Sequence, residues 1–286
     1  MSAPAPIGVF DSGYGGLSML RELRRTMPDT DFTYLGDAGR APYGGRDVET
    51  ILDFAEQCVE RLFDEGCRVV IVACHTVSCV ALRHLQRRHH GDRRVLGVTI
   101  PAAEVAVRNT RGRIGFLGTA RTVASHTFRT EVRKLAPAME VVEVAAPLLA
   151  PIVEEGWEDS DIARLAVARY VAALGEVDTI VLGCTHFPLL AKAFAEAVSR
   201  EVAVLNPAPF VAERFANWLA RHPDFASTGN GRLRVLCSGD GSRFAKHAAR
   251  FLGETPPQIE QVAEIKGRLA FCAEGQEPQG QVVRGN

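Results

Sequence analysis

Two cysteines stand in matching surroundings in this sequence. Cys74 opens the motif Cys-His-Thr and Cys184 opens the motif Cys-Thr-His, and each follows a short apolar run. A lone buried thiol at a strand end would be an ordinary core residue, but a matched pair favours a shared chemical role. Moving a proton from one face of a carbon to the other needs a base and an acid on opposite sides, and a thiolate and a thiol serve both roles. The pair therefore predicts racemisation at an α-carbon.

Such a site also needs proton-handling neighbours and hydrogen-bond donors. His186 could share a proton with Cys184, and Asp11 could do so for Cys74, because thiol pKa values respond to adjacent groups. Hydrogen bonds to the substrate carboxylate would stabilise the carbanion. The candidate donors, several of which are equally good helix caps, are Ser12, Thr76, Thr119, Thr122 and Thr185.

Other kinds of site remain open at this point. Cys74, His75, Cys184 and His186 could bind zinc, although adjacent Cys and His do not have the usual ligand spacing. A Cys-His hydrolase would leave the second matched cysteine without a role. A non-enzymatic protein that binds a small anion or a protein partner would need neither sulfur. The glycine-rich loop at residues 11–16 is either a phosphate cradle or a tight turn. The carboxylate of Asp11 would repel a phosphate, so it disfavours the first interpretation.

Composition narrows the class of protein. The formal net charge of −1 predicts no nucleic-acid or membrane partner. The N-terminus lacks a signal-peptide pattern and the seven cysteines are odd in number, so we expect a cytoplasmic protein without a disulfide framework. We expect no metal and no cofactor, because no lysine stands at a predicted strand end, where a pyridoxal Schiff base would form. The lysines are Lys134, Lys192, Lys246 and Lys266.

Short apolar segments alternate with amphipathic ones along the chain, which predicts an α/β fold with mainly parallel sheets flanked by helices. The predicted strands are 7–10, 32–35, 68–73, 95–98, 114–117, 140–144, 179–182, 202–205 and 233–236. Asp47 is a candidate N-cap of one helix and Ser160 of another. Ligands bind beyond the carboxyl ends of such strands, and both cysteine motifs fall there.

The chain also resembles itself. IGVFDSG is similar to IGFLGTA, VVIVACHT to TIVLGCTH, and GVTIPA to AVLNPA, in the same order and at nearly constant spacing. This predicts two similar domains with the active site in the cleft between them. We expect residues 1–97 and 210–266 to form the first domain and residues 98–209 the second, and we expect residues 267–286 to be a flexible tail.

On these residues the chain resembles the bacterial glutamate racemases of the aspartate/glutamate racemase superfamily. The resemblance spans residues 7 to about 209, with a looser match at PIVEEG. The matching segments are GVFDSGYGG, YLGDAGRAPYG, VVIVACHT, GVTIPA and VLGCTHFPLL. It implies a cofactor-independent isomerase that interconverts L- and D-glutamate, supplies D-glutamate for peptidoglycan and hence cell shape, and forms homodimers. A racemase for aspartate or another amino acid is the alternative.

The resemblance also implies roles for individual residues. Cys74 would be the base for the D-enantiomer and Cys184 the base for the L-enantiomer, with Asp11 and His186 as their proton-handling neighbours. The positions implied to contact or lie near the substrate include Ser12, Tyr43, Gly44, Thr76, Glu154 and Thr185. His75 stands where the family usually has Asn, and we interpret it as one hydrogen-bonding group replacing another. Phe187 stands where the family usually has Tyr.

Overall fold

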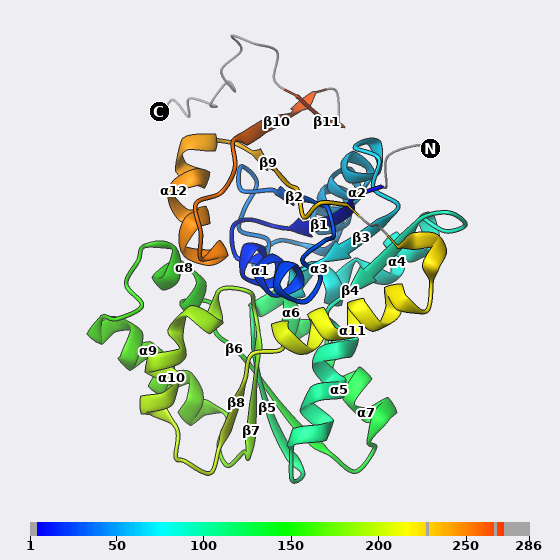
Figure 1. Ribbon diagram of the computed structural model, residues 1–286. Coiled ribbons are helices and arrows are strands. Elements are labelled where there is room, and N and C mark those ends of the chain that lie inside the picture. Colours follow the sequence, from blue (N-terminus) through cyan, green and yellow to red (C-terminus); the bar gives the residue numbers. More distant parts are fainter. Residues whose placement is uncertain (1–4, 227–228, 266–267, 272–286) are drawn as a thin grey trace.

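Two β-sheets organise the computed structural model, which describes residues 5–226, 229–265 and 268–271. They form two lobes, one above the other, with the strands of each sheet covered by helices (Figure 1). The predicted α/β fold, with mainly parallel sheets flanked by helices, is confirmed.

The first sheet has the strand order β11-β10-β9-β2-β1-β3-β4. All its neighbouring strands are parallel except β10 and β11, which are antiparallel. Its strands, drawn from both ends of the chain, are β1 (Ile7–Asp11), β2 (Phe32–Gly36), β3 (Val69–Val72), β4 (Arg94–Gly97), β9 (Leu233–Ser238), β10 (Ile259–Ile265) and β11 (Arg268–Phe271).

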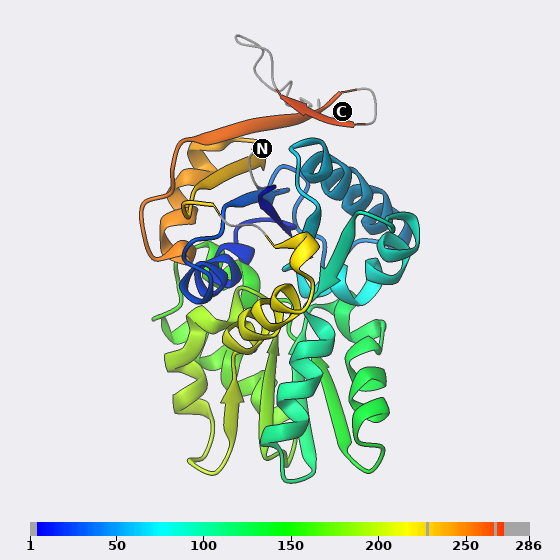
Figure 2. The same cartoon turned by 45° about the vertical axis from the view of Figure 1, so that its right-hand side comes forward.

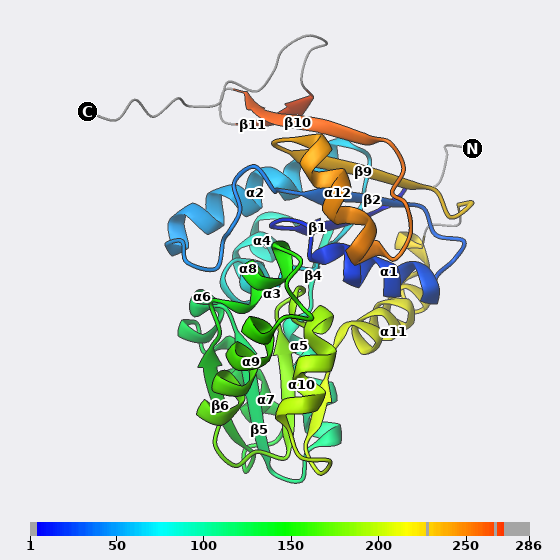
Figure 3. The ribbon, with the colours of Figure 1, turned by 90° about the vertical axis from the view of Figure 1, so that its left-hand side faces the viewer.

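Helices cover both faces of this sheet because alternate strand residues are apolar on each side. In β3, Val69 and Ile71 pack with α1, α11 and α12, whereas Val70 and Val72 pack with α2, α3 and α4. Figure 3 shows α1 and α12 on the face opposite α2. These helices are α1 (Gly16–Thr26), α2 (Val48–Asp64), α3 (His75–Val80), α4 (Leu82–Arg88), α11 (Ala208–Ala220) and α12 (Gly241–Leu252), with a 3-10 turn η2 (Pro223–Phe225).

The second sheet is parallel throughout, in the order β6-β5-β7-β8. Its strands are β5 (Arg113–Gly118), β6 (Glu140–Ala145), β7 (Thr179–Gly183) and β8 (Ala203–Leu205). Phe116 and Val181 pack with α5 and α7 on one face, and Ile180 and Leu182 lie in the core on the other. The flanking helices are α5 (Thr99–Asn109), α6 (Ala120–Ala124), α7 (Thr127–Leu135), α8 (Leu149–Glu154), α9 (Asp161–Ala173) and α10 (Ala191–Ala197), with a 3-10 turn η1 (Phe187–Leu190).

The chain passes between the two lobes at β4–α5 and again at β8–α11. Helices α5 and α11 therefore lie side by side at the junction, which Figure 2 shows from the front. This arrangement brings the carboxyl ends of the strands of the two sheets toward each other, where their loops meet.

The local signals predicted for two helices are confirmed. Asp47 caps α2 by accepting a hydrogen bond from the backbone N–H of Thr50, and Ser160 caps α9 in the same way from Ala163. A carboxylate or hydroxyl oxygen at this position satisfies an N–H that has no partner within the helix.

The prediction of a flexible tail from residue 267 was wrong for its first part. Residues 268–271 form β11, which pairs with β10, a strand that the sequence analysis also missed. The reason is tertiary: Val262 and Leu269 are buried in the core against α2, although their local sequence is rich in polar residues. The rest of the predicted tail lies outside the described residues.

Within the described part of the chain, no helix combines the length and apolar character that crossing a bilayer requires.

Candidate active site

Both cysteines line one cavity of about 280 Å³, here called the two-cysteine cavity. Loops that follow strands of both sheets build it, as expected for ligand sites in parallel α/β folds. It is lined by Ser12, Gly13, Ala41, Pro42, Tyr43, Gly44, Gly45, Cys74, His75, Thr76, Thr119, Ala120, Ala146, Pro147, Ala150, Pro151, Glu154, Cys184, Thr185 and His186. The two thiols that the sequence analysis paired are therefore brought to the same site.

Cys74 directly precedes α3 in the first lobe, just beyond the buried strand β3. Its Sγ atom lies 3.3 Å from the Oγ atom of Ser12, which follows the neighbouring strand β1. Burial raises the pKa of the Cys74 thiol to about 12; the charges of Asp11 and Cys184 add to this, and the Ser12 hydroxyl opposes it. Cys74 is therefore a thiol at neutral pH.

Cys184 follows β7 in the second lobe and has a different partner. Its Sγ atom lies 3.7 Å from Nδ1 of His186, and Nε2 of the same ring lies 3.1 Å from Oε1 of Glu154 in α8. Burial alone would lower the pKa of His186, but its hydrogen bonds to Cys184 and Glu154 raise that pKa to about 10. The geometry thus favours a cationic imidazole beside the Cys184 sulfur.

Asp11 lies directly behind the lining of the cavity rather than in it. Its carboxylate is fully buried, accepts a hydrogen bond from the backbone N–H of Gly13 at 3.0 Å, and lies 3.5 Å from the hydroxyl of Thr185. Burial raises the pKa of Asp11, and the charge of His186 opposes that shift. Asp11 is therefore placed to influence both halves of the site through its neighbours.

The glycine-rich loop after β1 serves close packing between the lobes. A Cβ atom at Gly15 would lie 2.3 Å from Oγ1 of Thr185 and 2.6 Å from Nδ1 of His186. A Cβ atom at Gly16 would lie 2.4 Å from Cβ of Asp11. The missing side chains therefore let Thr185 and His186 approach the loop that follows β1.

Three threonines form a hydrogen-bonded cluster at the cavity. Oγ1 of Thr76 lies 3.0 Å from Oγ1 of Thr119 and 3.1 Å from Oγ1 of Thr122. Thr76 and Thr119 line the cavity, whereas Thr122 is buried behind them. Thr119 also caps α6, so the same residue is a helix cap and lines the cavity.

The loop that carries Tyr43 and Gly44 depends on a buried network that the sequence analysis missed. The phenol of Tyr43 donates a hydrogen bond to the fully buried Asp37, which also pairs with Arg40 at 2.8 Å and accepts from Ser238. Asp37 directly follows β2 and Asp11 ends the neighbouring strand β1, so an acidic residue at the carboxyl end of a buried strand was the available signal.

His75 is 3% exposed and lines the cavity, and neither of its ring nitrogens has a hydrogen-bond partner in the described structure. Burial lowers the pKa of His75 to about 4, so its ring is neutral at physiological pH.

The described residues contain no group of three or more His, Cys, Asp or Glu side chains arranged to hold a metal ion. The four residues considered above as zinc ligands thus do not form such a group.

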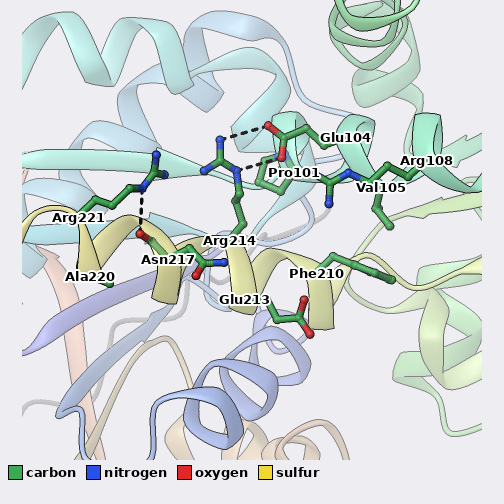
Figure 4. A pocket seen from close by; sticks show the side chains of 10 residues that line it. All are labelled: Pro101, Glu104, Val105, Arg108, Phe210, Glu213, Arg214, Asn217, Ala220 and Arg221. Carbon is green, nitrogen blue, oxygen red and sulfur yellow. Dashed lines mark hydrogen bonds and ion pairs between the residues drawn. The ribbon is translucent and has the colours of Figure 1, made fainter.

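A larger pocket of about 490 Å³ lies between α5 and α11, at the junction of the lobes (Figure 4). Arg214 and Glu104, which both line it, form an ion pair at 3.0 Å. The described residues that line this pocket include no cysteine or histidine, so they offer no acid–base pair comparable with that of the two-cysteine cavity.

The fold and the cavity define a two-lobed α/β protein whose inter-lobe site carries paired thiols. A model of the Asp/Glu/Hydantoin racemase family matches residues 7–214. The chain belongs to this family and is an isomerase.

Similar proteins cover nearly the whole chain. The glutamate racemase of Neisseria gonorrhoeae is 39% identical over 263 residues, which are 90% of this chain and 96% of that protein. The crystal structure of the Francisella tularensis glutamate racemase in complex with D-glutamate has a TM-score of 0.84 at 26% identity, covering 91% of this chain and 97% of that one. The Thermus thermophilus glutamate racemase in complex with β-chloro-D-alanine has a TM-score of 0.81 at 35% identity, with the same coverage.

Proposed function

We propose that this protein interconverts L-glutamate and D-glutamate by proton transfer between the substrate α-carbon and two cysteines, Cys74 and Cys184. The observation that carries the proposal is that both thiols, which lie in different lobes, line a single cavity. The glutamate racemases to which the chain is similar support the choice of substrate.

In one direction, the Cys184 thiolate removes the α-proton of L-glutamate while the Cys74 thiol donates a proton to the opposite face. The C–H bond breaks toward Cys184, a new C–H bond forms from Cys74, and the enzyme is left with a Cys74 thiolate and a Cys184 thiol. The reverse exchange acts on D-glutamate. The two thiols supply both acid and base, so this reaction needs no cofactor.

The groups around the two thiols stabilise charge, adjust proton affinity and bind the substrate. His186 and Glu154 stabilise the charge at Cys184, and Ser12 and Asp11 adjust the proton affinity of Cys74. The hydroxyls of Thr76, Thr119 and Thr185, together with the loop around Tyr43 and Gly44, hold the substrate carboxylates and the carbanion. Thr122 acts by positioning Thr76 and Thr119.

The biological setting belongs to the same proposal. D-Glutamate made here would enter peptidoglycan, and the protein would act in the cytoplasm as a homodimer. Its two domains would comprise residues 1–97 with 210–266, now extended to 271 by β11, and residues 98–209.

Isotope exchange tests the reaction. The protein given L-glutamate in heavy water should produce D-glutamate and place deuterium at Cα, measured by NMR and chiral chromatography. Cys74→Ser and Cys184→Ser should each abolish racemisation, while circular dichroism verifies that both variants fold. Wild-type racemisation by either variant would refute the mechanism. Exchange with aspartate but not with glutamate would refute the substrate.

A further inference from the structure

Arg250 reaches from the first lobe to the helix that carries Glu154. It lies in the last turn of α12, and its Nη2 atom donates to the backbone carbonyl of Val153 at 3.0 Å and to Oε1 of Glu158 at 2.5 Å. Figure 1 shows α12 and α8 at the same side of the junction between the lobes. One guanidinium therefore ties α12 of the first lobe to α8, and to the loop after it, in the second.

The two acceptors lie on either side of the turn that ends α8. Val153 directly precedes Glu154 near the end of the helix, where carbonyl groups lack partners within the helix and arginine side chains can bind them. Glu158 lies in the loop between α8 and α9, and Gly156 turns the chain between them with a φ of 76°. Binding both acceptors restricts the direction in which Glu154 projects.

Helix α12 provides a firm support for this contact. Its apolar face is buried in the core, so the backbone that carries Arg250 is held in place. Phe251, the next residue, contacts the His186 ring edge-on, with the ring centroids 5.2 Å apart. The end of α12 therefore contacts both the helix that carries Glu154 and the ring to which Glu154 is bonded.

The bond between Glu154 and His186 helps to set the charge beside Cys184. Burial would lower the pKa of His186, but its hydrogen bonds to Cys184 and Glu154 raise that pKa to about 10. Asp11 is a further carboxylate near the ring. The contact between Nε2 of His186 and Oε1 of Glu154 is 3.1 Å long, so a small displacement of α8 would weaken it.

We propose that Arg250 is a positioning residue for racemisation: by holding the end of α8 from the first lobe, it keeps Glu154 in contact with His186. This inference rests on the proposed function and deepens it, because it assigns a role to a side chain outside the site. Arg250 is not among the described residues that line the two-cysteine cavity, so it acts through Glu154 and not on the substrate.

The sign of one pKa shift separates positioning from a simple effect of charge. Arg250→Met removes the guanidinium and keeps much of the apolar stem. If Arg250 acted only through its charge, its loss would raise the pKa of His186, because a neighbouring cation disappears. If Arg250 positions Glu154, its loss lowers the pKa of His186, because the bond from the ring to the carboxylate weakens. NMR titration of the His186 ring measures this shift.

Arg243→Met is the matched control. Arg243 lies in the first turn of α12, and its charge, like that of His247, acts on Glu154. Among the described contacts, its side chain makes no hydrogen bond to α8. Arg243→Met should therefore keep the wild-type kcat/KM and should not lower the pKa of His186. Arg250→Lys, which keeps a cation and a donor, should recover part of what Arg250→Met loses.

We expect Arg250→Met to lower the pKa of His186 and to reduce kcat/KM for L-glutamate at least about tenfold. The rate should also begin to fall at a lower pH than in the wild type. Added to Glu154→Gln, Arg250→Met should lower the pKa of His186 little further, because both changes act on one hydrogen bond. An unchanged or raised pKa in Arg250→Met would overturn the inference, and so would an undiminished effect in the double variant.

A measurement on the unaltered protein covers the case in which Arg250→Met fails to fold. A guanidinium held by two acceptors rotates slowly, so the Nη–H groups of Arg250, assigned by comparison with Arg250→Lys, should give separate ¹H–¹⁵N signals at low temperature. A single averaged signal would overturn the inference, because a freely rotating group cannot hold α8. A wild-type protein that does not racemise glutamate would refute the proposed function instead; the two NMR measurements need no substrate and would still decide whether Arg250 holds Glu154.

Discussion

The Sγ atom of Cys184 lies 3.7 Å from Nδ1 of His186. Among the described residues, none supplies such a cation to Cys74: its side-chain hydrogen-bond partner is the hydroxyl of Ser12, and the nearby Asp11 carboxylate adds a negative charge. The two thiols that share the cavity are thus electrostatically unequal before any substrate is bound.

Unequal surroundings predict unequal reactivity toward alkylating agents, because the thiolate is the nucleophile. In the absence of substrate at neutral pH, Cys74→Ser, which retains Cys184, should react with iodoacetamide at least about tenfold faster than Cys184→Ser. Peptide mass spectrometry after timed labelling would locate the modified residue. Faster labelling of Cys74 would show that the His186 ring does not control which of the two thiols is the more reactive.

Glu154→Gln should lower the pKa of His186, because the anion that hydrogen-bonds the ring is removed while the geometry is kept. The raised pKa of His186 stabilises the wild-type fold below about pH 6.5, and this contribution is lost as the pH rises through about 10. The variant should lose that contribution at a lower pH.

NMR titration of the His186 ring and urea unfolding between pH 6 and pH 10 would measure both effects. The rate of L-glutamate conversion should begin to fall at a lower pH in Glu154→Gln than in the wild type. Identical His186 titration curves in the two proteins would show that Glu154 does not control the ring.

Gly15→Ala should damage activity more than stability. Gly15 has φ −58° and ψ −35°, a helical conformation that alanine adopts readily. Its Cβ atom would nevertheless lie within 2.6 Å of atoms of Thr185 and His186, so the Cys184 loop must shift. We expect kcat/KM to fall about a hundredfold, since small displacements of catalytic groups have effects of this size. A folded variant of wild-type activity, verified by its thermal melting, would argue against this tight contact.

Asp37→Asn should reduce the free energy of unfolding by about 3 kcal/mol, because it removes the anion of a buried pair and leaves Arg40 poorly matched. Tyr43→Phe, which deletes only the hydroxyl bound to Asp37, should cost about 1 kcal/mol. Urea denaturation would measure both values, and the KM for glutamate should rise in each case as the Tyr43 loop loosens. Equal stability of the two variants would indicate that the Arg40 pair contributes little.

Much of the fold could be predicted because its signals are local. The buried strands before Cys74 and Cys184 are short apolar runs, and the helix that starts after Asp47 carries its cap in the sequence. β10 and β11 escaped prediction because only their packing against α2 distinguishes them from a polar tail.

The candidate site also has a part that the sequence predicted and a part that it did not. The sequence identified Glu154 and Thr119 only as separate residues, and the fold joined Glu154 to His186 and Thr119 to Thr76. It gave no indication that Asp37 anchors Tyr43 or that Ser238 at the end of β9 donates to the same carboxylate, a contact that exists because β9 lies beside β2.

The sequence by itself determined that two thiols end equivalent strands in two related halves. Apolar strand segments are recognised from neighbouring residues, and the repeat is recognised by comparing two segments of the same chain. Only the tertiary structure decided that these thiols share one cavity, that Asp11 stands behind its lining, and that His75 is buried without a partner. Such relationships depend on how separate lobes pack against each other, and burial and hydrogen bonding between residues far apart in the chain then set the charge of each group.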